Sequence, residues 1–184
     1  MNYGLIILLI ILGICTLYFV IVYNKLINLN NKIKESFATM DVYLKKRWDL
    51  IPNIVETVKG YAKHEKDTFK EIIEMRNSDY DILSDEQKIK TNEQLTKDIS
   101  KIMALAEAYP NLKANKNFLD LQKSLKDIED EIAQSRKYYN ATIRVYNNLV
   151  EMIPSNIIAK ILGYNTKNMF EANADERQNI KVKL

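Results

Sequence analysis

The side chains that most often do chemistry in proteins are sparse in this sequence and do not form a complete catalytic set. His64 is the only histidine and Cys15 is the only cysteine. A zinc-hydrolase helix needs a second histidine one turn after the first, and none follows His64. A Ser–His–acid or Cys–His nucleophile would also depend on His64, and no nucleophile motif accompanies it. We therefore interpret His64 as a residue on the surface of a helix, and Cys15 excludes disulfides and cysteine metal sites.

Two groups of carboxylates have the spacing of metal ligands on helices. Glu71 and Glu74 lie one turn apart, and Glu129, Asp130 and Glu131 follow one another. A di-metal site in a helical bundle requires Glu-x-x-His pairs from two helices, which a single histidine cannot complete. The sequence also has no glycine-rich phosphate-binding loop. It therefore predicts no metal site, no cofactor and no enzymatic activity.

The strongest signal is instead an apolar stretch at the N-terminus. Residues 1–24 carry no charged side chain, and all 27 basic and 24 acidic residues follow them. At about 1.5 Å per helical residue, the run from Leu5 to Tyr23 can cross roughly 30 Å of hydrocarbon. The run lacks the basic start and the small-residue cleavage site of a secretory signal. We expect an uncleaved transmembrane helix of a single-pass membrane protein, with the lipid bilayer as the partner of residues 5–23.

The charges that flank the apolar run predict its orientation. Lys25, Lys32 and Lys34 follow the run, and no lysine or arginine precedes it. The positive-inside rule then places the C-terminal domain in the cytoplasm. The net charge of +3 is mild and no dense basic block occurs, so nucleic acid is not an expected partner.

Long helices are predicted for the remaining chain, because four glycines and three prolines are few for 184 residues. Apolar residues recur at steps of three and four from Leu26 to Trp48, which indicates a helical face continuing from the anchor. Pro52 lacks a backbone donor, so we expect a kink or helix junction there, with Asp49 as the N-cap of the next helix. After a polar turn, Ser84 is predicted to start another helix.

The most regular apolar pattern runs from Phe118 to Ile153 in alternating steps of three and four, as in a coiled-coil seam. Pro154 should end this helix, Ser155 should cap a short helix at 156–162, and Gly163 should stop it. The predicted fold is all-α, with an N-terminal transmembrane helix followed by an elongated antiparallel helical bundle. The predicted domains are the transmembrane anchor at 1–24, the helical bundle at 25–163 and a polar C-terminal tail at 164–184.

Two tyrosines on the seam carry hydroxyls that need partners in a packed core. Tyr139 and Tyr146 lie one heptad apart, and each is followed by asparagine. Arg47 and Glu107 are candidates to meet them. Two interpretations stay open at this point: a binding groove, or internal hydrogen bonds that fix the register of the helices.

Three blocks of the sequence resemble a known family. The first runs from Asp41 to Tyr61 and the second from Ala106 to Asn115. The third consists of Arg136 to Asn140, Tyr146–Asn147 and Ile153 to Asn156. Together they resemble the LemA family of bacterial membrane proteins. The resemblance implies an N-terminal membrane segment, a helical bundle and no established catalytic activity, and members are often described beside membrane-bound metallopeptidases or in specialised membrane compartments.

The leading functional hypothesis is a membrane-tethered interaction or scaffolding protein with an unidentified protein partner. The alternatives are a regulator or accessory subunit of a membrane metallopeptidase and, from another class, a metal-dependent enzyme. The candidate interaction or structural residues come from the three blocks. They are Arg47, Trp48, Asp49, Pro52, Glu107, Tyr109, Pro110, Asn115, Arg136, Tyr139, Asn140, Tyr146, Asn147 and Pro154.

Overall fold

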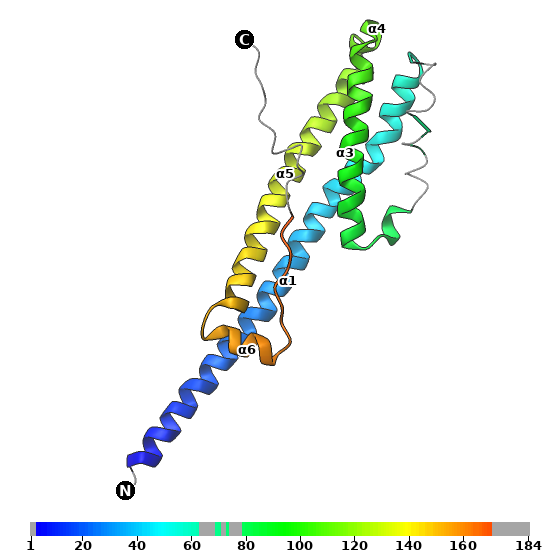
Figure 1. The fold of residues 1–184 in the computed structure, drawn as a ribbon. Helices are drawn as coiled ribbons and strands as arrows, with labels where there is room; N and C mark the ends of the chain where they lie inside the picture. The colour runs from blue at the N-terminus through cyan, green and yellow to red at the C-terminus, as the bar shows by residue number, and fades with distance from the viewer. Residues whose placement is uncertain (1–2, 63–68, 71–72, 74–78, 171–184) are drawn as a thin grey trace, which may run out of the picture. The chain divides into compact units, whose positions relative to one another are not determined.

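The computed structural model describes residues 3–62, 69–70, 73 and 79–170, and every regular element with assigned bounds there is a helix (Figure 1). The all-α prediction is confirmed. His64, Glu71 and Glu74 lie outside the described residues. The elements are α1 (Tyr3–Lys59), η1 (Tyr80–Ile82), α3 (Asp85–Glu107), α4 (Pro110–Lys113), α5 (Lys116–Glu151) and α6 (Ser155–Ile161).

The N-terminal apolar run and the first soluble helix form one 57-residue helix, α1, as the uninterrupted apolar face predicted. This helix is long and apolar enough to cross a membrane. Every side chain from residue 3 to residue 21 is exposed, whereas Val22 and Leu26 are buried at 3% and 0% exposure. An all-apolar helix surface without protein neighbours is what a lipid-facing segment requires.

Of the kink or helix junction predicted around Pro52, the junction is wrong, because α1 continues through this proline to Lys59. The kink stays a prediction. Asp49 does not cap a new helix; its carboxylate pairs with Lys45 of the preceding turn at 3.3 Å. Pro52 removes one hydrogen bond from the helix interior. Trp48 and Val55, on either side of Pro52, are both buried, so packing of one continuous face offsets that loss.

The start of α3 agrees with the sequence. The hydroxyl of Ser84 accepts a hydrogen bond from the backbone N–H of Gln87, and the side chain of Gln87 accepts one from the N–H of Ser84. This reciprocal capping box satisfies two donors that a helix start leaves open. The predicted apolar face is turned inward, with Leu95 and Ile102 at 1% and 0% exposure.

The predicted seam of α5 is largely confirmed. Its buried members are Phe118, Leu125, Ile132, Ser135, Thr142 and Tyr146. The pattern fails at its C-terminal end, because α5 ends at Glu151 and Ile153 is 82% exposed in the following turn. The predicted seam also omitted Ile143, which is fully buried. The seam takes two positions per heptad, whereas the buried face of a helix in a bundle is often three positions wide.

The short helix α6 begins one residue earlier than expected. Ser155 is its first residue rather than its N-cap, and its hydroxyl donates to the carbonyl of Met152 at 2.9 Å. Pro154 occupies the N-cap position and makes no side-chain hydrogen bond there. Gly163 follows the helix with a φ of +75°, the left-handed conformation that commonly ends helices at glycine.

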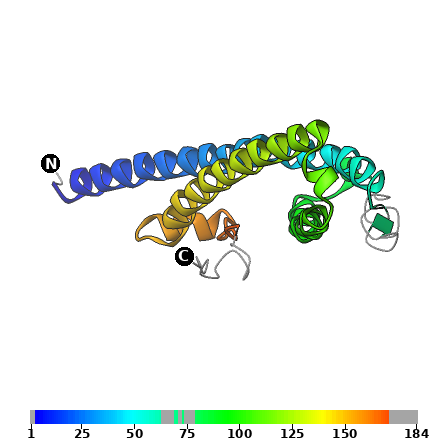
Figure 2. The same ribbon diagram turned by 90° about the horizontal axis from the view of Figure 1, so that it is seen from above.

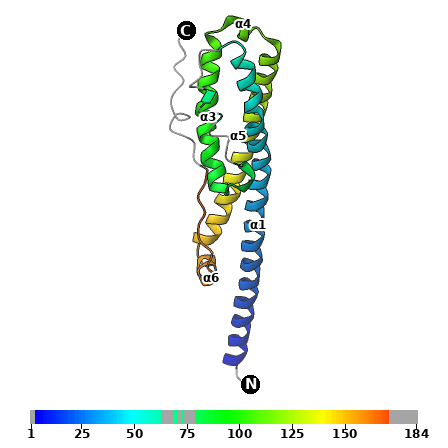
Figure 3. The same ribbon diagram turned by 90° about the vertical axis from the view of Figure 1, so that its right-hand side faces the viewer.

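The chain divides into two compact units. Unit 1 comprises Met1–Thr39 and Ser135–Glu171, and the helical part of unit 2 comprises Met40–Gln134. The core of unit 1 joins Val22, Leu26 and Ile33 of α1 to Ile143 and Tyr146 of α5 and to Ile158 and Ala159 of α6. In Figures 1 and 3, α1 continues past α6 toward the N-terminus.

Unit 2 combines the C-terminal half of α1, α3, α4 and the N-terminal half of α5. Figure 2 looks along α3, with α1 and α5 seen from the side. Contacts of Arg47 with Glu129 and of Tyr61 with Asn115 show that α1 and α5 are antiparallel. Because Asp41 pairs with Lys88 and Arg47 with Thr96, α3 runs in the same direction as α1.

Candidate functional site

Among the described residues of unit 2, the most buried charge is the guanidinium of Arg47, on the inner face of α1. Its Nε lies 3.1 Å from Oε1 of Glu129, and its Nη1 donates to Oε2 of the same carboxylate at 3.2 Å. Its Nη2 donates to the carbonyl of Asn92 at 3.3 Å and to the hydroxyl of Thr96. The Arg47 side chain is 1% exposed, whereas that of Glu129 is 39% exposed. A fork-shaped pair of this kind holds α1, α3 and α5 in fixed register.

A second polar cluster lies one to two turns away on α1. Nζ of Lys88 is 2.6 Å from Oδ2 of Asp41, and the hydroxyl of Tyr80 donates to the other oxygen, Oδ1, at 2.9 Å. Burial, followed by the hydrogen bond to Asp41 and its charge, raises the pKa of Tyr80 far above its ordinary value. The Tyr80 ring also packs against Trp48, with centroids 5.5 Å apart. This cluster fastens η1 and α3 to α1.

A groove lies beside the Arg47 network, between α3 and α5. Its volume is about 540 Å³. Thr96 and Glu129 belong both to the groove wall and to the network, so Arg47 fixes two of the groove's polar side chains. The remaining lining is given by Ile99, Ser100 and Met103 of α3 and by Leu119, Gln122, Lys123, Leu125 and Lys126 of α5.

The charges at the groove are mainly positive. Lys123 and Lys126 are exposed, and neither forms an ion pair with a described residue. The negative charge of Glu129 is already compensated by Arg47. Leu119 is 47% exposed at the groove and offers apolar surface to a ligand. The groove therefore combines an apolar lining with two cations.

Unit 1 uses the predicted Tyr–Asn repeats in a different way. Asn140 donates to the carbonyl of Phe170 and accepts from its N–H, both at 2.8 Å. Asn147 makes the same pair of bonds with Lys167, both at 2.9 Å. These two side chains hold an extended segment along α5 much as a neighbouring strand would. The asparagines of the repeats thus hold the segment at 167–170 to α5, a role that the sequence did not predict.

The aromatic and cationic residues of unit 1 complete this attachment. The hydroxyl of Tyr146 donates to the carbonyl of Asn165 at 3.0 Å, so its partner is neither Arg47 nor Glu107. Burial, and to a lesser extent Tyr164, raises the pKa of Tyr146. Tyr139 packs edge-on against Phe37 at 5.9 Å, and the guanidinium of Arg136 lies 4.2 Å from the ring centre of Phe170.

Several other candidate residues take helix-end positions. Glu107 is the last residue of α3, and Tyr109 precedes Pro110 at the start of α4. Asn115 caps α5 by accepting from the N–H of Phe118 at 3.1 Å, and it donates to the hydroxyl of Tyr61 at 2.9 Å. These residues shape the turns of unit 2. An interaction role for them stays a prediction.

Sequence reasoning missed most partners of Arg47 and Asp41. Thr96, Asn92, Lys88 and Tyr80 lie 39 to 49 positions away in sequence, and no local pattern connects them. Glu129 was singled out as a member of a carboxylate cluster, and the structure instead pairs it with arginine. In the part of the chain that the structure describes, no three His, Cys, Asp or Glu side chains are grouped to bind a metal ion.

The arrangement defines a class of protein: a membrane-associated helical protein in which one helix of the described residues, α1, is long and apolar enough to span a membrane. Comparison with known proteins is more specific. The LemA family model matches residues 36–184. The chain therefore belongs to the LemA family.

Individual relatives support this assignment over different lengths. Protein LemA of Metamycoplasma hominis is 26% identical over 177 residues, which cover 95% of this chain and 81% of that protein. Magnetosome protein MamQ of Magnetospirillum gryphiswaldense is 32% identical over 66 residues, 36% of this chain and 24% of that protein. Magnetosome protein MamQ 2 of Paramagnetospirillum magneticum is 32% identical over 73 residues, 40% of this chain and 27% of that protein. The chain thus spans only about a quarter of the length of the magnetosome relatives.

Proposed function

We propose that this protein is a membrane-tethered, non-catalytic binding protein whose groove between α3 and α5 takes up a segment of a partner protein. The partner segment carries apolar side chains flanked by acidic residues. The observation that carries the proposal is the groove itself, with its apolar lining and the two exposed cations Lys123 and Lys126.

The size and chemistry of the groove fit an amphipathic segment. Helix-in-groove recognition places apolar side chains at helical spacing into a hydrophobic furrow and leaves the polar face in water. Leu119 and Leu125 would contact such side chains, while carboxylates of the partner would lie near Lys123 and Lys126. Rim charges of this kind speed association and select partners more than they add affinity.

The Arg47 network supports this role by keeping the groove in shape. Arg47 compensates Glu129 and binds Thr96, and both of these residues line the groove. A negative charge in the groove wall would otherwise repel an acidic partner. The buried guanidinium is therefore a positioning group for the groove as well as a structural one.

The membrane anchor would give the groove access to partners in the same membrane. Tethering restricts both proteins to one surface and raises their effective concentration. The orientation that the positive-inside rule predicts, with the groove in the cytoplasm, is part of this proposal.

The direct test uses two synthetic helical peptides with the same leucine positions, one with glutamates and one with lysines between them. Fluorescence anisotropy would measure their binding to the full chain in detergent micelles. We expect the glutamate peptide to bind at least tenfold more tightly. The double substitution Lys123→Glu and Lys126→Glu should reverse that preference.

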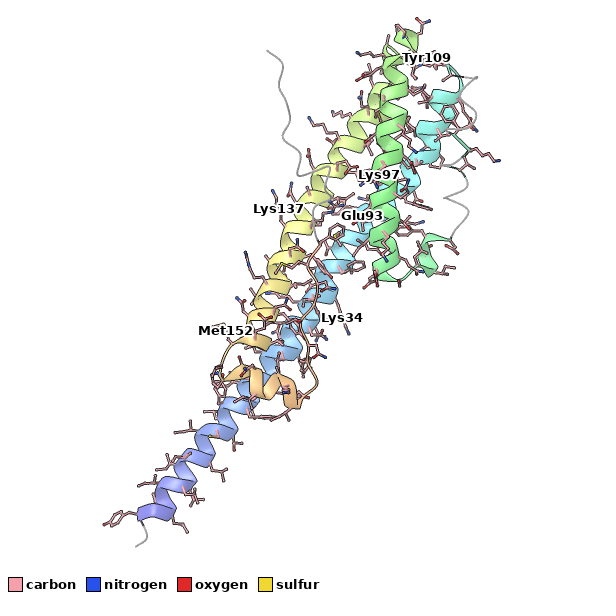
Figure 4. All side chains as sticks on the ribbon, viewed as in Figure 1. Lys34, Glu93, Lys97, Tyr109, Lys137 and Met152 are labelled. Carbon is pink, nitrogen blue, oxygen red and sulfur yellow. The ribbon has the colours of Figure 1, made fainter. Side chains whose placement is uncertain are left out.

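A charge-matched control separates the groove from net charge. Lys34→Glu with Lys137→Glu changes the same number of charges at exposed sites of unit 1, labelled in Figure 4, and should leave the preference unchanged. Equal binding of both peptides, or equal loss in both double variants, would overturn the groove assignment.

The partner itself can be caught in cells from the same groove. A photo-crosslinking amino acid at position 119 should capture a membrane-associated partner through a segment rich in acidic residues. Ser124 is exposed on the opposite side of α5 and serves as the matched control position. Equal capture of that segment from positions 119 and 124 would argue against the groove.

A further inference from the structure

Four large apolar side chains around α6 are exposed, although the helix is packed against the core of unit 1. Met152 and Ile153 precede α6 with 61% and 82% exposure. Ile157 and Ile161 lie one turn apart on α6 with 58% and 72% exposure. Four exposed large apolar side chains within ten residues favour an interaction site, because ordinary surface carries such residues singly.

The opposite face of α6 is attached to the membrane-spanning helix. Ile158 and Ala159 are buried in the same core cluster as Val22 and Leu26 of α1. Val22 belongs to the apolar run that ends at Tyr23. The helix α6 therefore lies beside the point where α1 leaves its apolar run, and Figures 1 and 3 show α1 extending beyond it.

The depth of this point in a bilayer follows from helix geometry. From Leu5 to Val22 a helix rises about 26 Å at 1.5 Å per residue, against roughly 30 Å of hydrocarbon. Val22 thus falls near the boundary between acyl chains and head groups. Tyr23, 40% exposed, and Lys25 follow directly, and both residue types favour this boundary.

We propose that the turn 152–154 and α6 form a second membrane contact, lying in the interface plane with Met152, Ile153, Ile157 and Ile161 inserted among the acyl chains. Val22 packs in the same buried cluster as Ile158 and Ala159, and the α1 residues just before it, Val20 and Ile21, are exposed, so lipids that surround α1 lie next to α6 as well. Lys160 is exposed beside the apolar stripe and is placed to meet lipid phosphates.

The stripe has only four large apolar side chains, so its membrane contact supplements the anchor and does not replace it. Two attachments instead of one fix how unit 1 tilts and rotates at the bilayer surface, since interfacial anchors set these angles for a spanning helix. The proposal rests on the anchor and not on the groove of unit 2, so each can fail without the other.

The test measures depth at α6 in the full chain, reconstituted in vesicles of phosphatidylcholine and phosphatidylglycerol. Cys15→Ser removes the native thiol, and Ile157→Cys receives a nitroxide spin label at an exposed site where folding is undisturbed. Lys137→Cys is the control: it is exposed on α5, about 22 Å from Met152 at 1.5 Å per residue, and both are labelled in Figure 4.

We expect the label at 157 to be at least fivefold more accessible to oxygen, relative to a water-soluble nickel complex, than the label at 137. Equal accessibility ratios at the two positions would overturn the proposal. A short distance between the labels of two fully labelled chains in the same vesicle would also overturn the proposal, since a second copy would then cover the stripe.

Discussion

The two units differ in the polar contacts that hold their segments together. Unit 2 encloses a full positive charge, Arg47, and compensates it with Glu129 across the bundle. Unit 1 uses uncharged amides, Asn140 and Asn147, which bind the backbone of an extended segment. The comparison teaches that a segment can be attached to a long helix either by one buried ion pair or by several uncharged hydrogen bonds.

The energetic consequence differs between the units. A buried charge loses hydration, and removing one partner leaves the other uncompensated, which costs several kcal/mol. Neutral hydrogen bonds to backbone contribute about 1 kcal/mol each, and water can replace a lost partner at a partly exposed site. Unit 2 should therefore respond sharply to single changes and recover with paired changes, whereas unit 1 should lose stability in small steps.

The largest expected effect comes from Glu129→Leu, which leaves the Arg47 guanidinium buried without its carboxylate. We expect the free energy of unfolding to fall by about 3 kcal/mol, near the lower bound for a broken buried pair, because Glu129 is partly exposed. Urea unfolding of the full chain in micelles measures it through Trp48, the single tryptophan, which is buried in unit 2.

Two variants show whether the buried charge causes that loss. Arg47→Met added to Glu129→Leu removes the whole pair and should restore most of the stability. Glu86→Leu breaks an exposed pair with Lys90, 3.2 Å long, and should cost about 0.5 kcal/mol or less. If Glu129→Leu costs no more than Glu86→Leu, the two units do not differ as described.

A smaller effect is expected in unit 1 from Asn140→Ala. The substitution removes both hydrogen bonds to Phe170, so the attached segment should open with a loss of about 1–2 kcal/mol. Native-state hydrogen exchange should show the amide of Phe170 exchanging roughly 10-fold faster. Asn148→Ala, an exposed neighbour of Asn147, should leave that amide unchanged; similar acceleration in both variants would refute the role of Asn140.

The same contrast explains how much of the structure the sequence could predict. Periodicity located α3 and α5, and the Ser84 capping signal located a helix start, because these depend on neighbours within a turn or two. The helix junction predicted at Pro52 does not form, because burial of Trp48 and Val55 outweighs one lost hydrogen bond.

The candidate site was less predictable than the fold. Arg47 was singled out, but its partners on α3 and α5 depend on how three helices meet, which no local pattern records. The asparagines of unit 1 were recognised from their repeat. The segment that they bind, at 165–170, was expected only as part of a polar tail. Its sequence has no apolar periodicity, so nothing in it indicates which helix it will lie against.

The smallest effect at neutral pH is expected from Tyr80→Phe, which removes one hydrogen bond to Asp41 and should cost about 0.5–1 kcal/mol.

The pH dependence of the free energy of unfolding tests the role of Tyr80 more sharply than this loss at neutral pH. Tyr80 has a pKa raised above the ordinary 10.0 in the folded protein, so above pH 10 the unfolded chain releases this proton while the folded protein keeps it. The folded state then binds more protons, and the free energy of unfolding must fall as pH rises. Removing Tyr80 should make that fall shallower by up to about 1.4 kcal/mol per pH unit. Urea unfolding at pH 7, 10 and 11 compares wild type with Tyr80→Phe and with Tyr138→Phe, whose ring is 52% exposed. The Tyr138 variant should keep the wild-type slope. An equal slope in all three proteins would show that Tyr80 ionises as easily in the folded state as in the unfolded state. The polar cluster of unit 2 would then be no more sensitive to a single change than the amides of unit 1.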